Sequence, residues 1–120
     1  MAYTVGEIVH VAGFPVHPPK GKYCIFVHVG PNWFFLINTE NRKDYDCIPL
    51  LKKGRPFPTH DSYIGCKNIF QAEDSQITSK HGKLDSAELK ALLQKVRDSK
   101  FIPQDKKKII VAGIEQKLKS

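Results

Sequence analysis

The chain has 120 residues, of which 41% are hydrophobic and 26% charged, and this composition suits one soluble globular domain with one modest core. Its apolar runs, such as residues 109–114, are far shorter than the roughly 20 residues that span a bilayer, and its first residues lack the pattern of a secretory signal. The formal net charge of +7 favours a polyanionic partner, because phosphates attract clustered Lys and Arg side chains. The short apolar runs predict no membrane association, and three cysteines without CxxC spacing predict free thiols in a reducing, cytoplasmic compartment.

The part of the chain up to about residue 74 consists of short runs of β-branched and aromatic residues between turn residues. Only Gly30-Pro31-Asn32 separates residues 23–29 from residues 33–38, so these two runs predict a hairpin. Loops rich in Pro and Gly occupy residues 13–22 and 52–61. The pattern predicts a small antiparallel β-barrel over about residues 5–74, with strands at 7–12, 23–29, 33–38, 47–51 and, as the last strand, 63–71.

The periodicity changes to that of helices after residue 83. Asp85 and Glu88 have the spacing of a capping box, and apolar residues then recur on one helical face, which predicts a helix over about 85–99. Pro103 suits the first turn of a second helix over about 103–118. The lysines at 106–108 lie near its start, where cations oppose the helix dipole, so they form either a solvated face or a binding feature. The sequence therefore predicts a single α+β domain, a barrel followed by two helices.

The chain lacks the sequence motifs of metal sites, nucleotide-binding loops and serine hydrolases. The five histidines are dispersed without the spacing of a metal-ligand set, and the glycine-rich phosphate loops and the nucleophile elbow are missing from the sequence. We therefore expect neither a metal ion nor a cofactor. A metal-free reaction that fits a basic chain is RNA cleavage by the substrate's own 2′-hydroxyl, which needs a base, an acid and a cation.

The candidate residues for these roles lie in three segments. The loop before the second strand supplies His17, Lys20 and Lys22, the hairpin ends at Asn38 and Thr39, and His60, Asp61 and Ser62 precede the last strand. Their positions permit convergence at one rim of a barrel. Each also has a plain structural interpretation, as an exposed loop residue, a surface charge or a turn residue with local hydrogen bonds. The aromatic residues at 33–35 could stack on bases, but side chains alternate along a strand, so at least one belongs to the core.

Five short motifs follow one another along the chain. They are Gly6-Glu7-Ile8-Val9, Gly21-Lys22-Tyr23-Cys24-Ile25-Phe26-Val27, Phe35-Leu36-Ile37-Asn38-Thr39, the strand from Ser62 to Ile69, and Gly82-Lys83-Leu84 with the helix start after it. Together, in this order and spacing, they resemble the PemK/MazF-like toxins of bacterial toxin–antitoxin pairs. The resemblance implies an SH3-like barrel, a homodimer, metal-independent cleavage of single-stranded RNA, and a cognate antitoxin whose acidic or hydrophobic tail occupies the RNA groove.

The resemblance also assigns positions. Lys22 falls where the family commonly has an Arg at the scissile phosphate, Thr39 or Asn38 falls at a hydroxyl position, and His17 lies near a loop histidine of some members. Lys keeps the charge of Arg but lacks its bidentate fork. Some members carry an Arg and an Asp on either side of a Cys in the last strand, whereas this chain has Gly65 and Lys67 there. Activity must then depend on His60, Asp61 or His17, or be absent.

Three hypotheses follow. The first is a toxin-like endoribonuclease in which Lys22 binds phosphate, Thr39 contacts the substrate, and His17 or His60 exchanges protons, oriented by Asp61. In it, the RNA contacts come from Lys20, Lys22, Asn38, Ser62 and Lys67. The second is a non-catalytic SH3-like module that binds RNA or a protein through the same groove. The third is a structural or regulatory protein of a phage or mobile element.

Overall fold

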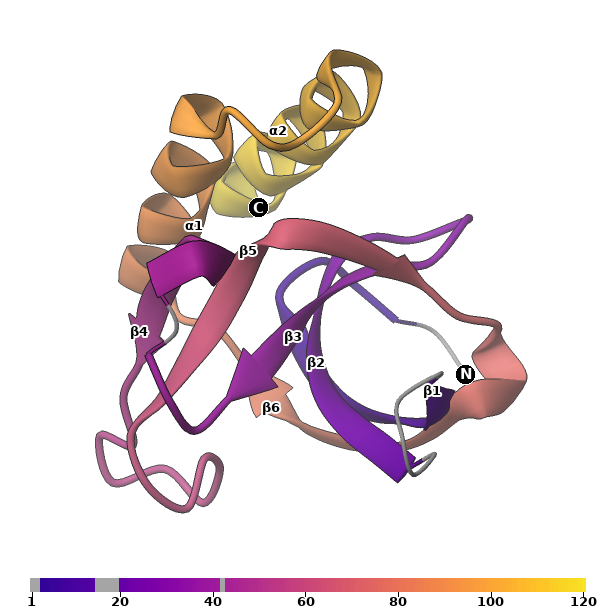
Figure 1. Ribbon diagram of the computed structural model, residues 1–120, viewed down its shortest axis with the longest axis vertical. Coiled ribbons are helices and arrows are strands. Elements are labelled where there is room, and N and C mark those ends of the chain that lie inside the picture. The colour runs from indigo at the N-terminus through magenta and orange to yellow at the C-terminus, as the bar shows by residue number, and fades with distance from the viewer. Residues whose placement is uncertain (1–2, 15–19, 42) are drawn as a thin grey trace.

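The computed structural model describes residues 3–14, 20–41 and 43–120, and it contains one antiparallel β-sheet followed by two helices (Figure 1). The predicted α+β class and the two C-terminal helices are confirmed. The elements are β1 (Glu7–Phe14), β2 (Lys20–His28), β3 (Trp33–Asn38), β4 (Cys47–Leu50), β5 (Ser62–Gln71), β6 (Ile77–Lys83), α1 (Ser86–Asp98) and α2 (Gln104–Lys119), with short 3-10 turns at Lys43–Tyr45 and Asp74–Gln76.

The strands form a six-stranded sheet in the order β4-β5-β3-β2-β1-β6. The predicted hairpin is the β2–β3 pair, in which Cys24 lies opposite Leu36. The sheet curls strongly (Figure 1), but β4 and β6 stand at its two ends and it does not close, so the predicted barrel is not established. The expectation that residues 63–71 form the last strand is wrong, because β6 pairs with the free side of β1. Ile77 is the only apolar β-branched aliphatic residue of β6, so the alternation of a half-buried strand is missing from its sequence.

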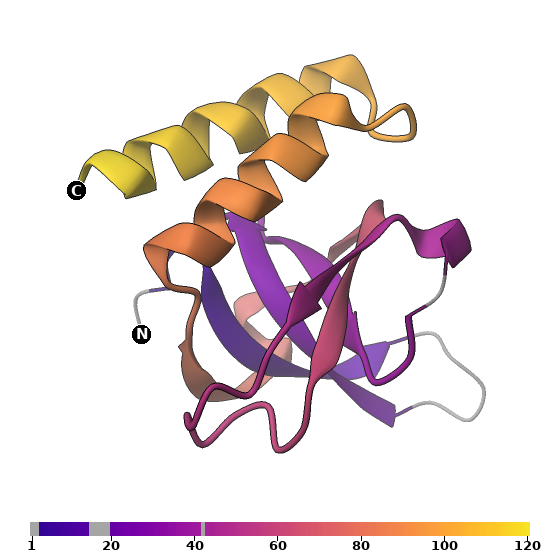
Figure 2. The ribbon, with the colours of Figure 1, turned by 90° about the vertical axis from the view of Figure 1, so that its left-hand side faces the viewer.

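The two faces of the sheet bury different clusters, because successive side chains of a strand point to opposite faces. One face packs under α1 and α2, which lie together as a layer over it in Figure 2. That cluster includes Ile8, Ile25, Val27, Phe35 and Ile64 from the sheet and Leu89, Leu92, Val96, Ile110 and Ile114 from the helices. The other face, inside the curl, buries Val9, Val11, Cys24, Phe26 and Phe34. Trp33, Phe34 and Phe35 are all buried, so these three aromatic rings are core residues rather than a stacking surface for bases.

The first helix begins as the sequence predicts. The Asp85 carboxylate accepts the Glu88 backbone N–H at 2.8 Å, and the Glu88 carboxylate accepts the Asp85 N–H at 3.0 Å. The hydrogen bond from the Glu88 backbone N–H to the Asp85 carboxylate is the main reason that the pKa of Asp85 lies below its ordinary value. Among the described residues, no helix is long and apolar enough to cross a membrane.

Candidate functional site

A row of polar side chains crosses the end of the sheet where β2 begins and β3 ends. Asn38 of β3 pairs with Tyr63 of β5, whereas β2 and β3 pair only as far as Cys24 and Leu36. Side chains alternate along a strand, so Lys22 lies on the same sheet face as Cys24, Leu36 and Asn38. An ammonium group, an amide and a phenol thus lie on one sheet face, each from a different strand. We call Lys22, Asn38 and Tyr63 the polar row.

The polar row lies on the face of the sheet that the helices leave uncovered. Its members alternate with residues that face α1 and α2, and they share a face with Cys24 and Leu36, which pack inside the curl. All three side chains are half-buried. Burial raises the pKa of the Cys24 thiol to about 12 although the charge of Lys22 opposes the shift, so this thiol remains protonated and is no nucleophile at neutral pH.

Gly65 leaves space beside the polar row. A Cβ atom built at this position would lie 3.6 Å from Asn38 Nδ2 and 3.6 Å from Tyr45 Cβ, which are ordinary contact distances. Gly65 is thus next to Asn38, and its position is open enough for a small side chain. The amide nitrogen of Asn38, the Cβ atom of Tyr45 and the Leu36 carbonyl oxygen border this space.

The loop between β4 and β5 comes to the same end of the sheet, and it carries His60 and Asp61. Both residues are exposed, and Thr39, which follows Asn38, is exposed as well. Asp61 accepts the Lys52 backbone N–H at 2.9 Å, so its carboxylate closes the loop rather than orienting an imidazole. Nδ1 of His60 lies 3.2 Å from the hydroxyl oxygen of the adjacent Thr59. His60 is thus an accessible titratable group three residues before Tyr63.

Ser62 has a structural place in this arrangement. Its side chain is only 4% exposed, and its hydroxyl donates to the His60 carbonyl at 3.0 Å. This hydrogen bond sets the direction in which the loop enters β5. A buried hydroxyl used in this way is not available to an RNA strand.

An ion pair between Arg55 and Glu88 anchors the same loop to the start of α1. One guanidinium nitrogen donates to Glu88 Oε1 at 2.9 Å, a second contacts Glu88 Oε2, and the Arg55 side chain also donates to the Leu51 carbonyl at 3.0 Å. The hydrogen bond to Glu88 is the main cause of the raised pKa of Arg55. Glu88 therefore belongs both to the helix cap and to the loop anchor, and it couples the two segments.

The other predicted site residues lie apart from the polar row or cannot be placed. Lys67 lies four residues beyond Tyr63, roughly 13 Å along β5, and its ammonium stands 4.9 Å from the centre of the Phe101 ring. Lys20 begins β2, but its side chain falls outside the described part of the structure, as does His17 altogether. Lys22 and Asn38 thus share one sheet face, and Thr39, His60 and Asp61 lie where β3 ends and β5 begins.

Sequence reasoning missed a second polar cluster, which lies on the opposite face of β2. His10 and His81 each pack against the ring of Tyr23, with ring centres 5.0 Å apart in both pairs. Burial, and then the charge of His10, lower the pKa of His81. The ring of Phe57, from the loop between β4 and β5, covers Tyr23 at 4.5 Å. The histidines lie far apart in the sequence, and the strand of His81 was not predicted, so only the pairing of β1 with β6 brings them together.

His10 of this cluster is held in one orientation. Its Nδ1 lies 2.6 Å from the Thr78 hydroxyl oxygen, and that hydroxyl donates to the His10 carbonyl at 3.2 Å. The neutral imidazole must then donate from Nδ1, which leaves Nε2 as the acceptor. The ring lies directly over Gly21, where a Cβ atom would overlap with Cε1 and Nε2. The packing of His10 therefore explains why glycine is required at position 21.

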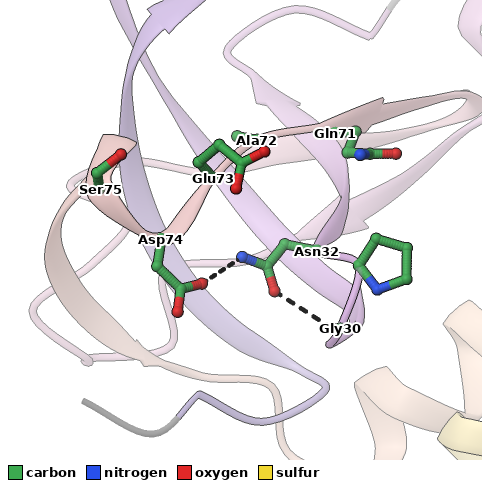
Figure 3. A pocket seen from close by; sticks show the side chains of 8 residues that line it. Gly30, Asn32, Gln71, Ala72, Glu73, Asp74 and Ser75 are labelled. Carbon is green, nitrogen blue, oxygen red and sulfur yellow. Dashed lines mark hydrogen bonds between the residues drawn. The ribbon is translucent and has the colours of Figure 1, made fainter.

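An open cleft of about 380 Å³ lies at the far end of the sheet (Figure 3). Asn32 stands in it and donates to the Asp74 carboxylate at 2.5 Å, while its own side-chain oxygen accepts the Gly30 N–H at 3.4 Å. These bonds tie the β2–β3 turn to the segment after β5. The cleft contains none of the predicted site residues; its lining is Gly30, Pro31, Asn32, Gln71, Ala72, Glu73, Asp74 and Ser75. Among the described residues, no group of three or more His, Cys, Asp and Glu side chains could hold a metal ion.

No protein-family model matches this chain, and no curated protein matches it. The resemblance to PemK/MazF-like toxins therefore depends on the five sequence motifs alone, and the activity that it implies stays a prediction. The fold class and the polar row stand independently of that resemblance.

Proposed function

We propose that the protein is a toxin-like endoribonuclease that binds single-stranded RNA along the polar row and cleaves it without a metal ion. The observation that carries the proposal is the sheet face that Lys22, Asn38 and Tyr63 share, with Asn38 paired to Tyr63 and with Thr39 and His60 beside that pair in the sequence. The net charge of +7 supports a polyanionic substrate. In this proposal the curled sheet is the SH3-like barrel of the PemK/MazF-like family.

The chemistry assigns each group one task. A base takes the proton of a ribose 2′-hydroxyl, the freed oxygen attacks the adjacent phosphorus, and the bond from phosphorus to the 5′-oxygen breaks as that oxygen accepts a proton from an acid. The products are a 2′,3′-cyclic phosphate and a 5′-hydroxyl. Lys22 stabilises the added negative charge of the phosphorane, Asn38 and Thr39 position the ribose and phosphate, and His60 exchanges the protons.

The test is incubation of the purified protein with a long single-stranded RNA in EDTA. We expect discrete fragments ending in cyclic phosphate. Lys22→Ala should slow cleavage about 100-fold, as loss of one donor to a developing charge does, and His60→Ala should slow it at least as much. Lys22→Arg should retain activity because it keeps the charge. Lys119→Ala, an exposed lysine at the end of α2, is the matched control and should leave the rate unchanged.

A second candidate function is RNA binding without cleavage. It is favoured by the local engagement of Asp61, whose carboxylate is held by the Lys52 N–H and does not orient His60. Intact RNA together with salt-sensitive binding that weakens in Lys22→Ala would support this module and refute the enzyme. If the RNA is neither cut nor bound, both functions are wrong.

The partners in this proposal come with the resemblance. They are single-stranded RNA in the cytoplasm, a second copy of the chain in a homodimer, and a cognate antitoxin whose tail competes with RNA for the polar row. Light scattering of the purified protein tests the homodimer. A small acidic open reading frame beside the gene, whose product blocks cleavage in the assay above, would identify the antitoxin.

A further inference from the structure

The turn between α1 and α2 carries an exposed aromatic ring within a set of lysines. Phe101 is 53% exposed although it is a large apolar residue, and its backbone N–H is held by the Ser99 hydroxyl at 3.1 Å. The adjacent Ile102 is buried at 4% exposure and also donates to Ser99, at 3.3 Å. The chain is thus anchored on one side of the turn and presents the Phe101 ring on the other. Figure 2 shows this turn above the sheet, at one end of the two helices.

Lysines of β5, of the turn and of α2 lie in this region, and Lys67 contacts the ring itself. Lys67 of β5 reaches across to place its ammonium 4.9 Å from the ring centre, and Lys100 is exposed next to it in the turn. The Lys107 ammonium donates to the Arg97 carbonyl at 3.2 Å and to the Ser99 carbonyl at 2.6 Å, so its positive charge is fixed at the end of α1. Asp98 and Asp105 are exposed carboxylates on the two sides of this turn. We call Lys67, Lys100, Phe101 and Lys107 the hairpin-tip surface.

We infer that the hairpin-tip surface is a second binding site for single-stranded RNA, in which a base stacks on Phe101 and the lysines contact the phosphates beside it. The inference rests on the RNA ligand of the proposed function but assigns it a different surface. Basic side chains around an exposed aromatic ring are the combination that binds single strands, since every base offers a π-face. A single nucleotide engages both features at once, because its base stacks on the ring while its phosphate meets the neighbouring ammonium group.

The magnitudes favour exchange of the Lys67 ammonium for a base. A cation over an exposed aromatic ring contributes about 0.5–1 kcal/mol, whereas stacking of one base contributes about 1–3 kcal/mol. The displaced ammonium has a flexible stem and remains beside the ring, where it meets the phosphate of the stacked nucleotide. This assigns Lys67, which the register keeps out of the polar row, a place in RNA binding.

The experiment is fluorescence anisotropy of a labelled oligouridine, about 20 nucleotides long and carrying 2′-O-methyl groups so that it cannot be cleaved. Phe101→Leu keeps an apolar side chain and removes the stacking face, so we expect affinity to fall about tenfold. Lys67→Ala should lower the slope of affinity against salt by about one unit. Lys119→Ala, at the other end of the helical hairpin, should lower affinity less than either change. Circular dichroism of each variant checks that it is folded.

The outcomes separate this inference from the proposed function. Loss of affinity in Phe101→Leu supports the hairpin-tip surface whether or not the wild-type protein cleaves RNA. Wild-type affinity in a folded Phe101→Leu protein overturns the surface and leaves the polar row unaffected. Equal weakening by Phe101→Leu and Lys119→Ala also overturns it, because that result means diffuse electrostatic attraction. A wild-type protein that does not bind the oligonucleotide refutes both proposals.

Discussion

The packing of His10 over Gly21 makes a stability prediction that can be worked out in numbers. Gly21→Ala adds a Cβ atom that overlaps with the imidazole, which must then rotate away. The rotation breaks the hydrogen bond from His10 to Thr78 and the ring contact with Tyr23. Each interaction contributes about 0.5–1.5 kcal/mol, while replacing glycine returns about 0.4–1 kcal/mol through the unfolded chain. We expect Gly21→Ala to lower the free energy of unfolding by about 1–2 kcal/mol.

The assay is urea unfolding followed by Trp33 fluorescence, in a double-mutant cycle. In a His10→Ala background the added Cβ meets no ring, so Gly21→Ala should be neutral or stabilising by up to about 1 kcal/mol. The sign of the effect therefore reverses between the two backgrounds. Gly65→Ala is the matched glycine control, since its Cβ would lie at ordinary contact distances, and it should change stability by less than about 0.5 kcal/mol.

Two results would refute this reasoning. One is a Gly21→Ala protein that is as stable as the wild type, which would mean that the imidazole does not lie over Gly21. The other is an equal loss of stability in both backgrounds, which would place the cause in the backbone of β2. A change in the urea dependence of the free energy of unfolding would instead indicate an altered unfolded state.

Three further predictions concern the loop anchor, the second histidine and the thiols. Arg55→Ala should lower the free energy of unfolding by about 1.5–3 kcal/mol, because it leaves the 8% exposed Glu88 without its partner. Lys53→Ala is the control in the same urea titration. It removes a half-exposed ion pair and should change the free energy of unfolding by less than about 0.5 kcal/mol. The pKa of His81 is lower in the folded protein than its ordinary value of 6.5, so the stability from this residue is complete above that pH and is lost as the pH falls through the folded pKa. Unfolding measured between about pH 5 and 8 should show this slope in the wild type and a shallower one in His81→Gln; equal slopes would contradict it. Cys47 is only partly buried, whereas Cys24 and Cys66 are buried with raised pKa values. A thiol reagent should therefore modify Cys47 quickly, and Cys24 and Cys66 only at the rate of unfolding. Mass spectrometry of the labelled protein measures the two rates.

Local patterns in the sequence were enough to predict most of the elements. The hairpin is confirmed because a connection of only four residues, 29–32, leaves its two strands no other nearby partner. Helix α1 is confirmed because Asp85 and Glu88 satisfy each other's backbone donors. Strand β6 escaped prediction because it is stabilised by pairing with β1 and not by an apolar face of its own. The closure of the sheet into a barrel could not be read from strand count, since closure depends on how far the sheet curls.

The candidate site shows the same division. The sequence singled out residues of the right chemistry, including Lys22, Asn38 and His60, because residue type and neighbouring turns are local properties. Which of them share a face was decided by the antiparallel register, in which a shift of one residue would turn every side chain to the other side. Lys67 lies further along β5, away from the polar row and against Phe101. The pairing of β1 with β6, the first and last strands, brings His10 and His81 to the same ring of Tyr23. Such contacts between distant residues depend on the pairing of whole strands, and for this reason only the tertiary structure settles them.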